Sequence, residues 1–110
     1  MYISITPSAT TSKIYVSAVY GATQDGGSNH YSYSQLNREE SGESDVGMGG
    51  HVVWYDTAGG DTGVSVVLQK LDAPATTAAL TYQVQARVQN ASSGFRPKSE
   101  ASIVAMEIGV

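Results

Sequence analysis

A strict alternation of apolar and polar residues near the end of the chain limits its possible folds more than any other feature. The apolar members are Leu80, Tyr82, Val84, Ala86 and Val88. The residues between them are Thr81, Gln83, Gln85, Arg87 and Gln89. Because successive side chains leave opposite faces of an extended chain, the pattern predicts a half-buried antiparallel strand over Leu80–Gln89.

Similar short segments recur along the rest of the chain, separated by residues typical of turns. The expected strands are Tyr2–Thr6, Lys13–Tyr20, His30–Leu36, His51–Asp56, Gly63–Leu71, Leu80–Gln89, a short piece near Phe95, and Ala101–Gly109. No stretch has a convincing helical period, so we expect almost no helix. Many short strands at this spacing predict an all-β, antiparallel sandwich or barrel of about eight strands.

The length and composition are those of one small domain, residues 1–110, with a single core. Only 15% of the residues are charged, against roughly 25% in typical globular chains. The polar surface is therefore built from Ser, Thr, Asn, Gln and Gly. Such a surface suits hydrogen bonding to neutral partners, and sugars are the obvious candidates. It also occurs on ordinary secreted and viral β proteins, so both interpretations stay open.

Charge and hydropathy exclude several function classes. The formal net charge is −4 and the six basic residues are scattered, which argues against nucleic-acid binding. No apolar run approaches the roughly 18 residues of a membrane span, and we expect neither membrane insertion nor a signal peptide. Cysteine is absent, so durability outside a cell would have to come from another source, and oligomerisation is the usual one.

Three segments together resemble a known family. They are SKIYVSA (Ser12–Ala18), VLQKLDAPATTAALTYQVQAR (Val67–Arg87) and SIVAMEI (Ser102–Ile108). In order and spacing they resemble the C-terminal head domain of bacteriophage tail fibres, especially those of marine phages. The resemblance covers about half of the chain. It departs from the family pattern at Ala73, where Ser is commoner, and at Val104-Ala105, which replaces a Thr-containing pair.

The resemblance implies a jelly-roll-like sandwich, assembled as a parallel homotrimer at the tip of a fibre shaft. It further implies a virion protein, made in the bacterial host cytoplasm, that attaches the phage to a host-cell receptor. That receptor would be a glycan or another outer-membrane component. Three alternatives remain: a structural cap or trimerisation module, a carbohydrate-binding accessory domain of a secreted enzyme, and a depolymerase. We expect no enzymatic activity and no cofactor.

The longest expected loop, residues 37–50, supplies the candidate receptor-binding residues. They are Asn37, Arg38, Glu39, Glu40, Glu43 and Asp45. If eight strands alternate in direction, both chain ends leave one end of the sandwich. The loops at 7–12, 37–50, 72–79 and 97–100 would then cluster at the other end, facing the host.

The acidic residues of this loop also raise the possibility of chemistry. Paired carboxylates can act as acid and base on sugars, and carboxylate oxygens bind divalent cations. However, the spacing matches no calcium-loop motif, and a solvated loop is the favoured interpretation. The two histidines, His30 and His51, have neither a Cys nor an H-x-H pair nearby to complete a metal site. We therefore expect no catalytic and no metal site.

Two patterns indicate contact between subunits. Tyr15 is out of phase with the apolar set of its own strand, so its side chain would lie at a subunit interface or form an exposed sugar platform; we favour the interface. The last strand is apolar on both faces, since Ile103 and Ala105 alternate with Val104, Met106 and Ile108. Such a strand is covered on both sides. Tyr15, Ile103 and Ala105 are therefore the candidate trimer-interface residues.

Overall fold

The computed structural model describes residues 1–25, 30–40, 46–56, 62–88 and 94–109. They form β1 (Tyr2–Ile5), β2 (Lys13–Asp25), β3 (His30–Glu40), β4 (Val46–Asp56), β5 (Thr62–Asp72), β6 (Leu80–Val88) and β7 (Gly94–Ile108). All strand pairs are antiparallel and none of these residues is helical, which confirms the all-β prediction. The described residues make seven strands rather than about eight, because the piece near Phe95 and the last expected strand are one element, β7.

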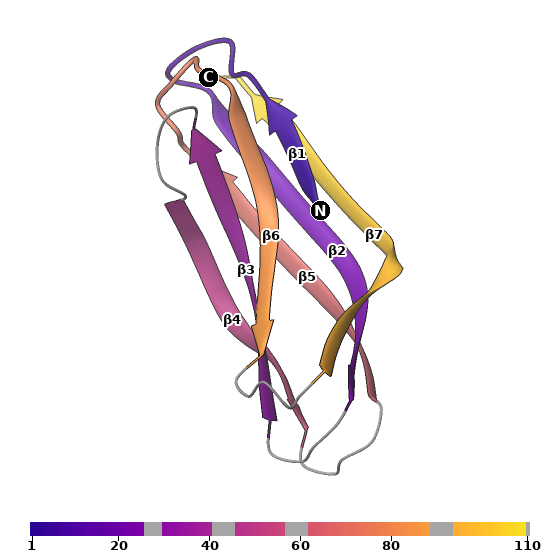
Figure 1. The fold of residues 1–110 in the computed structure, drawn as a ribbon. Helices are drawn as coiled ribbons and strands as arrows, with labels where there is room; N and C mark the ends of the chain where they lie inside the picture. The colour runs from indigo at the N-terminus through magenta and orange to yellow at the C-terminus, as the bar shows by residue number, and fades with distance from the viewer. Residues whose placement is uncertain (26–29, 41–45, 57–61, 89–93, 110) are drawn as a thin grey trace.

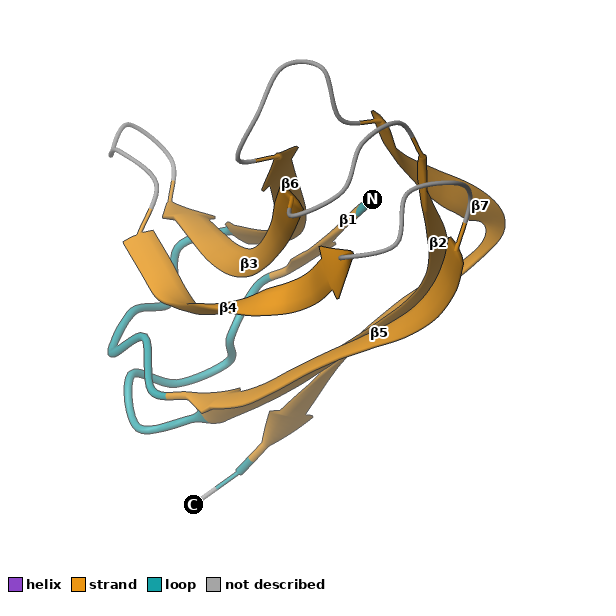
Figure 2. Ribbon diagram, turned by 90° about the horizontal axis from the view of Figure 1, so that it is seen from below, coloured by secondary structure: helices purple, strands orange, loops and turns teal. Residues whose placement is uncertain are grey.

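The strands form two sheets that face each other (Figures 1 and 2). One has the order β1-β6-β3-β4 and the other the order β5-β2-β7. The pairing is nested: β2 pairs with the last strand, β7, and β3 pairs with the last but one, β6. The same nested pairing arises when a long two-stranded hairpin, with β2–β3 as one arm and β6–β7 as the other, folds into two sheets.

The core lies between the sheets and comes from the apolar positions of the alternating strands. Ile14, Val16, Ala18 and Tyr20 of β2 are buried together, as their common phase predicts. The remaining buried apolar side chains are Ala22, Leu36, Val66, Leu68, Leu80 and Tyr82. Burial of each large member stabilises the fold by about 1.5–3 kcal/mol. The predicted alternation in β6 is confirmed for Leu80 and Tyr82, while Ala86 lies at the exposed end of the same row.

Two expected loops are strand in the structure, so the predicted boundaries of residues 37–50 and 97–100 are wrong. Asn37–Glu40 belongs to β3 and residues 46–50 belong to β4, which leaves only residues 41–45 as the connection. The period of two continues past Leu36, because Arg38 also points inward, toward the other sheet. In β7, Pro97 sits opposite Ala22, next to a register shift between Tyr20 and Ala22. An edge strand such as β7 tolerates a missing backbone donor.

The ends of the chain also differ from expectation. β7 ends beside the beginning of β2, since Ile108 pairs with Lys13, so it ends at the same end of the molecule as segments 6–12 and 73–79 (Figure 1). Glu107 secures this arrangement, because its Oε1 accepts hydrogen bonds of 2.7 Å from both the N–H and the Oγ of Ser8. We expected the C-terminus and the loops at 7–12 and 72–79 to lie at opposite ends of the sandwich, and this expectation is wrong. Because the described residues form one strand fewer than expected, the last strand runs in the opposite direction.

Candidate functional site

The two outer faces of the molecule differ sharply in chemistry. The outer face of the sheet β5-β2-β7 is largely apolar, and we call it the apolar face. Its apolar members are Tyr15, Val19, Val67, Leu71, Val104, Met106 and Ile108, and the polar pair Ser17 and Gln69 lies among them. The outer face of β1, β6 and β3 is polar, and we call it the amide face. It includes Tyr2, Tyr33, Gln35, Asn37, Gln83, Gln85 and Arg87, with Glu39 and Thr81 at its end.

The amide face is assembled by direct cross-strand pairs. Tyr33 lies opposite Arg87, Gln35 opposite Gln85, and Asn37 opposite Gln83. Tyr2 of β1 lies on the other side of Gln83 and is 71% exposed. Facing positions on adjacent strands bring side chains within about 5 Å of each other. The face is therefore a continuous band of amides flanked by two tyrosines.

A shallow hollow of about 110 Å³ lies on this band. Tyr33 and Arg87 border it on one side and Gln35 and Gln85 on the other, with Ser34 and Ala86 between the two pairs. The Arg87 guanidinium carbon lies 4.6 Å from the centre of the Tyr33 ring. This cation–π contact orients the ring and the guanidinium together. The hollow thus offers an aromatic ring, a five-donor cation and two amides to one small polar group.

Gly47 of β4 permits the position of Gln35. A Cβ atom at residue 47 would collide with Nε2 of Gln35, so only glycine lets this amide lie flat across β4. Next to it, Asn37 is buried, and its Oδ1 has no hydrogen-bond partner among the described residues. A buried acceptor of this kind is costly unless a donor reaches it. This acceptor is covered by protein, so it lies beneath the surface that a ligand would touch.

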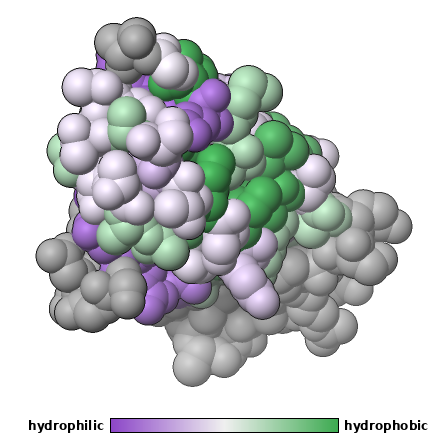
Figure 3. Space-filling view, turned by 90° about the horizontal axis from the view of Figure 1, so that it is seen from above, coloured by the Kyte–Doolittle hydropathy of each residue, from purple (hydrophilic) through white to green (hydrophobic). Residues whose placement is uncertain are grey.

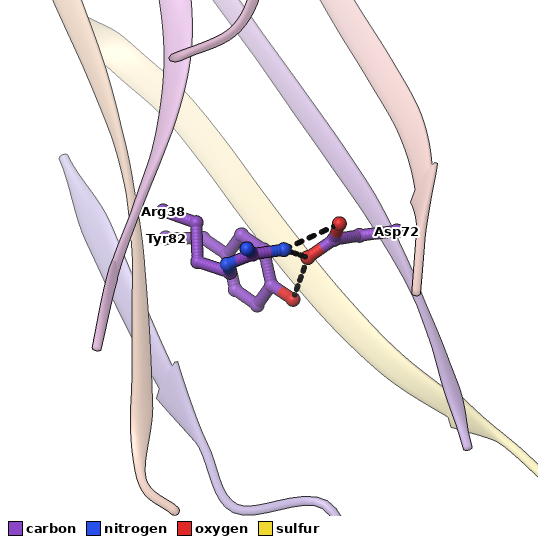
Figure 4. Close-up of polar contacts among 3 residues, drawn as sticks. All are labelled: Arg38, Asp72 and Tyr82. Atoms are coloured by element: carbon purple, nitrogen blue, oxygen red, sulfur yellow. Dashed lines mark hydrogen bonds and ion pairs between the residues drawn. The ribbon is translucent and has the colours of Figure 1, made fainter. Parts of the chain in front are cut away.

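Arg38, expected to bind a receptor, instead joins the two sheets (Figure 4). Its Nη1 donates to both carboxylate oxygens of Asp72, at 2.7 and 2.6 Å, and the hydroxyl of Tyr82 donates to Asp72 Oδ2 at 2.7 Å. Burial, and then the hydrogen bond to Asp72, raise the pKa of Tyr82, which stays a neutral donor. Burial would lower the pKa of Arg38, but Asp72 outweighs that effect and raises it. The expectation that Arg38 lies on an exposed loop is wrong.

The acidic candidates do not gather into one site. Glu39 is exposed, whereas Glu40 accepts a hydrogen bond of 3.1 Å from Thr76. Glu43 and Asp45 lie outside the described residues. Within the described ranges, no three His, Asp or Glu side chains come together as metal ligands would. Of the described members of the predicted receptor-binding set, Asn37 lies on the amide face next to Gln35, and Glu39 follows it on the same side of β3, opposite Thr81.

The interface candidates divide in the same way. Tyr15 is on the apolar face, between Leu71 and Met106, as its phase predicts. Ile103 and Ala105, by contrast, pack against the core, so the expectation that they face outward is wrong. The exposed side of β7 is the alternate set, with Met106 54% exposed and Val104 46% exposed. The prediction assigned the two sides of β7 the wrong way round, because a strand that is apolar on both sides gives no indication of which side meets the core.

The amide face was missed by sequence reasoning, although a signal for it exists. Gln, Asn, Tyr and Arg recur at every second position over residues 33–37 and 83–87, which places them on one side of each strand. Only the pairing of β3 with β6 brings the two rows together. In the space-filling view, hydrophobic residues gather toward one side of the molecule and paler, more polar residues cover the other (Figure 3).

Comparisons with known proteins do not identify this chain. No protein-family model matches it, and no curated protein is detectably similar to it. In the part of the chain that the structure describes, no helix has the length and apolar character needed to cross a membrane. The chemistry of the two faces is therefore the starting point for assigning a function.

Proposed function

We propose that this chain is the C-terminal head of a bacteriophage tail fibre, and that it attaches the virion to a bacterial surface glycan as a homotrimer. The observation that carries this proposal is the opposite chemistry of the two outer faces. One face is apolar and suited to contact with other copies of the chain. The other is polar, nearly neutral and aromatic, and suited to contact with sugar.

The amide face has the groups that neutral sugars require. Gln35 and Gln85, which border the hollow, can both donate to and accept from hydroxyl groups, because an amide carries two donors and one acceptor oxygen. Tyr2, which is 71% exposed, provides aromatic surface on which a sugar ring can stack, and Arg87, held over the Tyr33 ring, adds hydrogen-bond donors. The mechanism is therefore hydrogen bonding by amides combined with stacking on tyrosine. Each single contact is weak, and three copies on one fibre tip would add avidity toward a repetitive glycan.

The apolar face supports assembly. Val67, Leu71 and Met106 each expose more than half of their surface, at 55%, 51% and 54%. Leu71 and Met106 lie on either side of Tyr15, and Val67 lies farther along β5, opposite Val19. Ser17 and Gln69, which are hydrogen-bonded to each other, separate the two groups. Large apolar patches on a small domain mark contact surfaces, and homo-oligomers with closed symmetry are the commonest assemblies. In the trimer, this face of each copy packs toward the fibre axis.

The resemblance to tail-fibre heads is also supported by where its residues lie. Asp72 and Tyr82 belong to the middle resembling segment and contact each other directly. Glu107 of the last segment is held by Ser8 and by Ser12, which opens the first segment. These residues form one framework at the end of the molecule. The nested pairing of β2 with β7 and β3 with β6 favours the jelly-roll-like topology that the resemblance implies.

Whole-cell adsorption separates this proposal from its main rival, a structural cap that binds nothing. The domain, with its native mass measured, is incubated with host cells and with purified envelope glycans. We expect binding to a glycan and its loss in Gln85→Ala and Tyr33→Ala, with assembly unchanged. Ser65→Ala, which removes an exposed polar group from the other sheet, serves as the matched control. A domain that assembles as a trimer but binds no envelope fraction would establish the cap instead.

A further inference from the structure

Arg87 carries a positive charge on the amide face that no acidic group balances nearby. It is exposed near the end of β6, and within the described ranges it forms neither an ion pair nor a hydrogen bond. Its guanidinium carbon instead lies 4.6 Å from the centre of the Tyr33 ring. An aromatic ring attracts a cation through its quadrupole but does not cancel the charge. Arg87 therefore keeps its charge and has N–H donors to offer to a ligand.

The described charges of the amide face lie at its opposite ends. Glu39 is exposed at the other end, opposite Thr81. Because a strand rises about 3.4 Å per residue, the distance along β6 from Thr81 to Arg87 is about 20 Å. Salt screens exposed charges beyond about 8 Å at physiological ionic strength. The two charges cancel in sum, but the Arg87 end of the face is locally positive.

The hollow at this end is small and has no acidic wall. Its volume is about 110 Å³, whereas a cavity of about 150 Å³ accepts benzene. It therefore takes one substituent of a sugar rather than a whole ring. Among the described residues that line it, Arg87 is charged and none is acidic. A substituent that enters the hollow meets a cation, so an anionic substituent fits it best.

We propose that this hollow binds an oxyanion substituent of the glycan, a carboxylate or an ester sulfate, through Arg87. The inference rests on the glycan binding proposed above and adds that one sugar unit is acidic. A guanidinium presents paired N–H donors that match two oxygens of such a group. Its contact with Tyr33 holds it beside the hollow before the ligand arrives, which lowers the entropic cost of binding. The amides of Gln35 and Gln85 then bind hydroxyl groups of the same sugar unit.

The test measures the affinity of the whole domain for matched pairs of glycans by calorimetry. Galacturonan, glucuronan and alginate are each paired with the same glycan after reduction of its carboxylates to alcohols. A sulfated galactan is paired with its desulfated form, so the two sources of an oxyanion are distinguished. In at least one pair, we expect the acidic glycan to bind about tenfold more tightly than its neutral partner. Added salt should reduce this preference, because it screens the charge.

Variants of the protein separate the charge from the rest of the face. Arg87→Gln should abolish the preference for the acidic glycan, and Arg87→Lys should lose most of it, because an ammonium group lacks the planar pair of donors. Lys70→Gln removes an exposed cation from β5 in the other sheet and, as the matched control, should keep the full preference. Gln85→Ala should weaken both members of a pair alike, since it removes an amide and no charge.

The outcomes distinguish this inference from the proposed function on which it rests. Equal affinity for both members of every pair, or a preference that survives in Arg87→Gln, would overturn the acidic sugar and leave glycan binding in place. If the domain adsorbs to host cells but binds none of these glycans, the inference also fails alone. Absence of both glycan binding and adsorption to cells would overturn the two together.

Discussion

Arg38 and Asp72 bind across the gap between the two sheets, with Arg38 Nη1 2.6 Å from Asp72 Oδ2. The side chains are only 17% and 10% exposed, so water screens the pair weakly. Tyr82 donates to the same carboxylate oxygen. The carboxylate of Asp72, at the end of β5, thus connects β3 and β6 to the opposite sheet. It lies immediately before the loop between β5 and β6.

Neutralising this carboxylate should destabilise the protein strongly. In Asp72→Asn, Arg38 remains largely buried without its counter-charge, and breaking such a pair costs about 3 kcal/mol. Urea unfolding followed by circular dichroism measures the loss. The triple variant Arg38→Met, Asp72→Leu, Tyr82→Phe should recover most of it, because neither a charge nor the buried Tyr82 hydroxyl is then left without a partner. Equal stability of Asp72→Asn and the native protein would show that the pair is not a structural tie.

Acid should loosen the segment that leads into β2. Hydrogen bonds from Ser12 and Ser8 hold the pKa of Glu107 below its ordinary value. A lowered folded pKa means that the stabilisation is complete above the unfolded value of about 4.3 and is lost as pH falls through the folded pKa. Thermal melting between pH 2 and 7 should therefore show native protein more stable than Glu107→Gln near neutrality. The two curves should converge at the acid end. A difference that persists at pH 2 would contradict this origin.

Placing a charge on the apolar face should dissociate the proposed trimer. Met106→Lys puts an ammonium group beside Tyr15 on that face, and a charge without a partner is costly to desolvate. Light scattering at micromolar concentration should report a single folded chain for this variant. Gln83→Lys, on the amide face, is the matched control and should stay trimeric. If both variants keep the mass of the native protein, copies do not meet through this face.

A single methyl group should distinguish ligand binding from stability. Gly47→Ala places a Cβ where Nε2 of Gln35 lies, and the flexible amide can move away. We therefore expect a stability change below about 1 kcal/mol. Glycan binding should fall in both Gly47→Ala and Gln35→Ala, because the first variant displaces and the second removes the Gln35 amide that borders the hollow. Binding that survives in Gly47→Ala but not in Gln35→Ala would show that the position of this amide is not critical.

The loop between β5 and β6 contains a backbone strain that can be relieved. Ala75 has a φ of 55°, in the left-handed region, which costs a non-glycine residue about 1–2 kcal/mol. Ala75→Gly removes this cost but also gives the unfolded chain more freedom. The net result should be a stabilisation of about 0.5–1 kcal/mol, measured by urea unfolding. Ala79→Gly, in the same loop, gains no such relief and should be neutral or destabilising.

Alternation in the amino-acid pattern was enough to predict an all-β fold and the phase of the best strands. It placed Ile14, Val16, Leu80 and Tyr82 in the core, because a period of two is a local property of each strand. It also put Tyr15 out of phase with the core. The pattern did not predict where β3 ends, because Asn37–Glu40 is polar and its sequence is typical of a loop. Only the pairing of Arg38 with Asp72, far away in the chain, shows why this segment extends the strand.

Pairing between distant strands was decided by the tertiary structure alone. Ile103 and Ala105 face the core while Val104 and Met106 do not, and both rows are equally apolar, so only the packing against β2 selects between them. The amide face likewise exists because β3 lies beside β6, far away in the chain. Local patterns specify which residues share a side of a strand; the register of the sheets specifies which strands combine those sides into a surface.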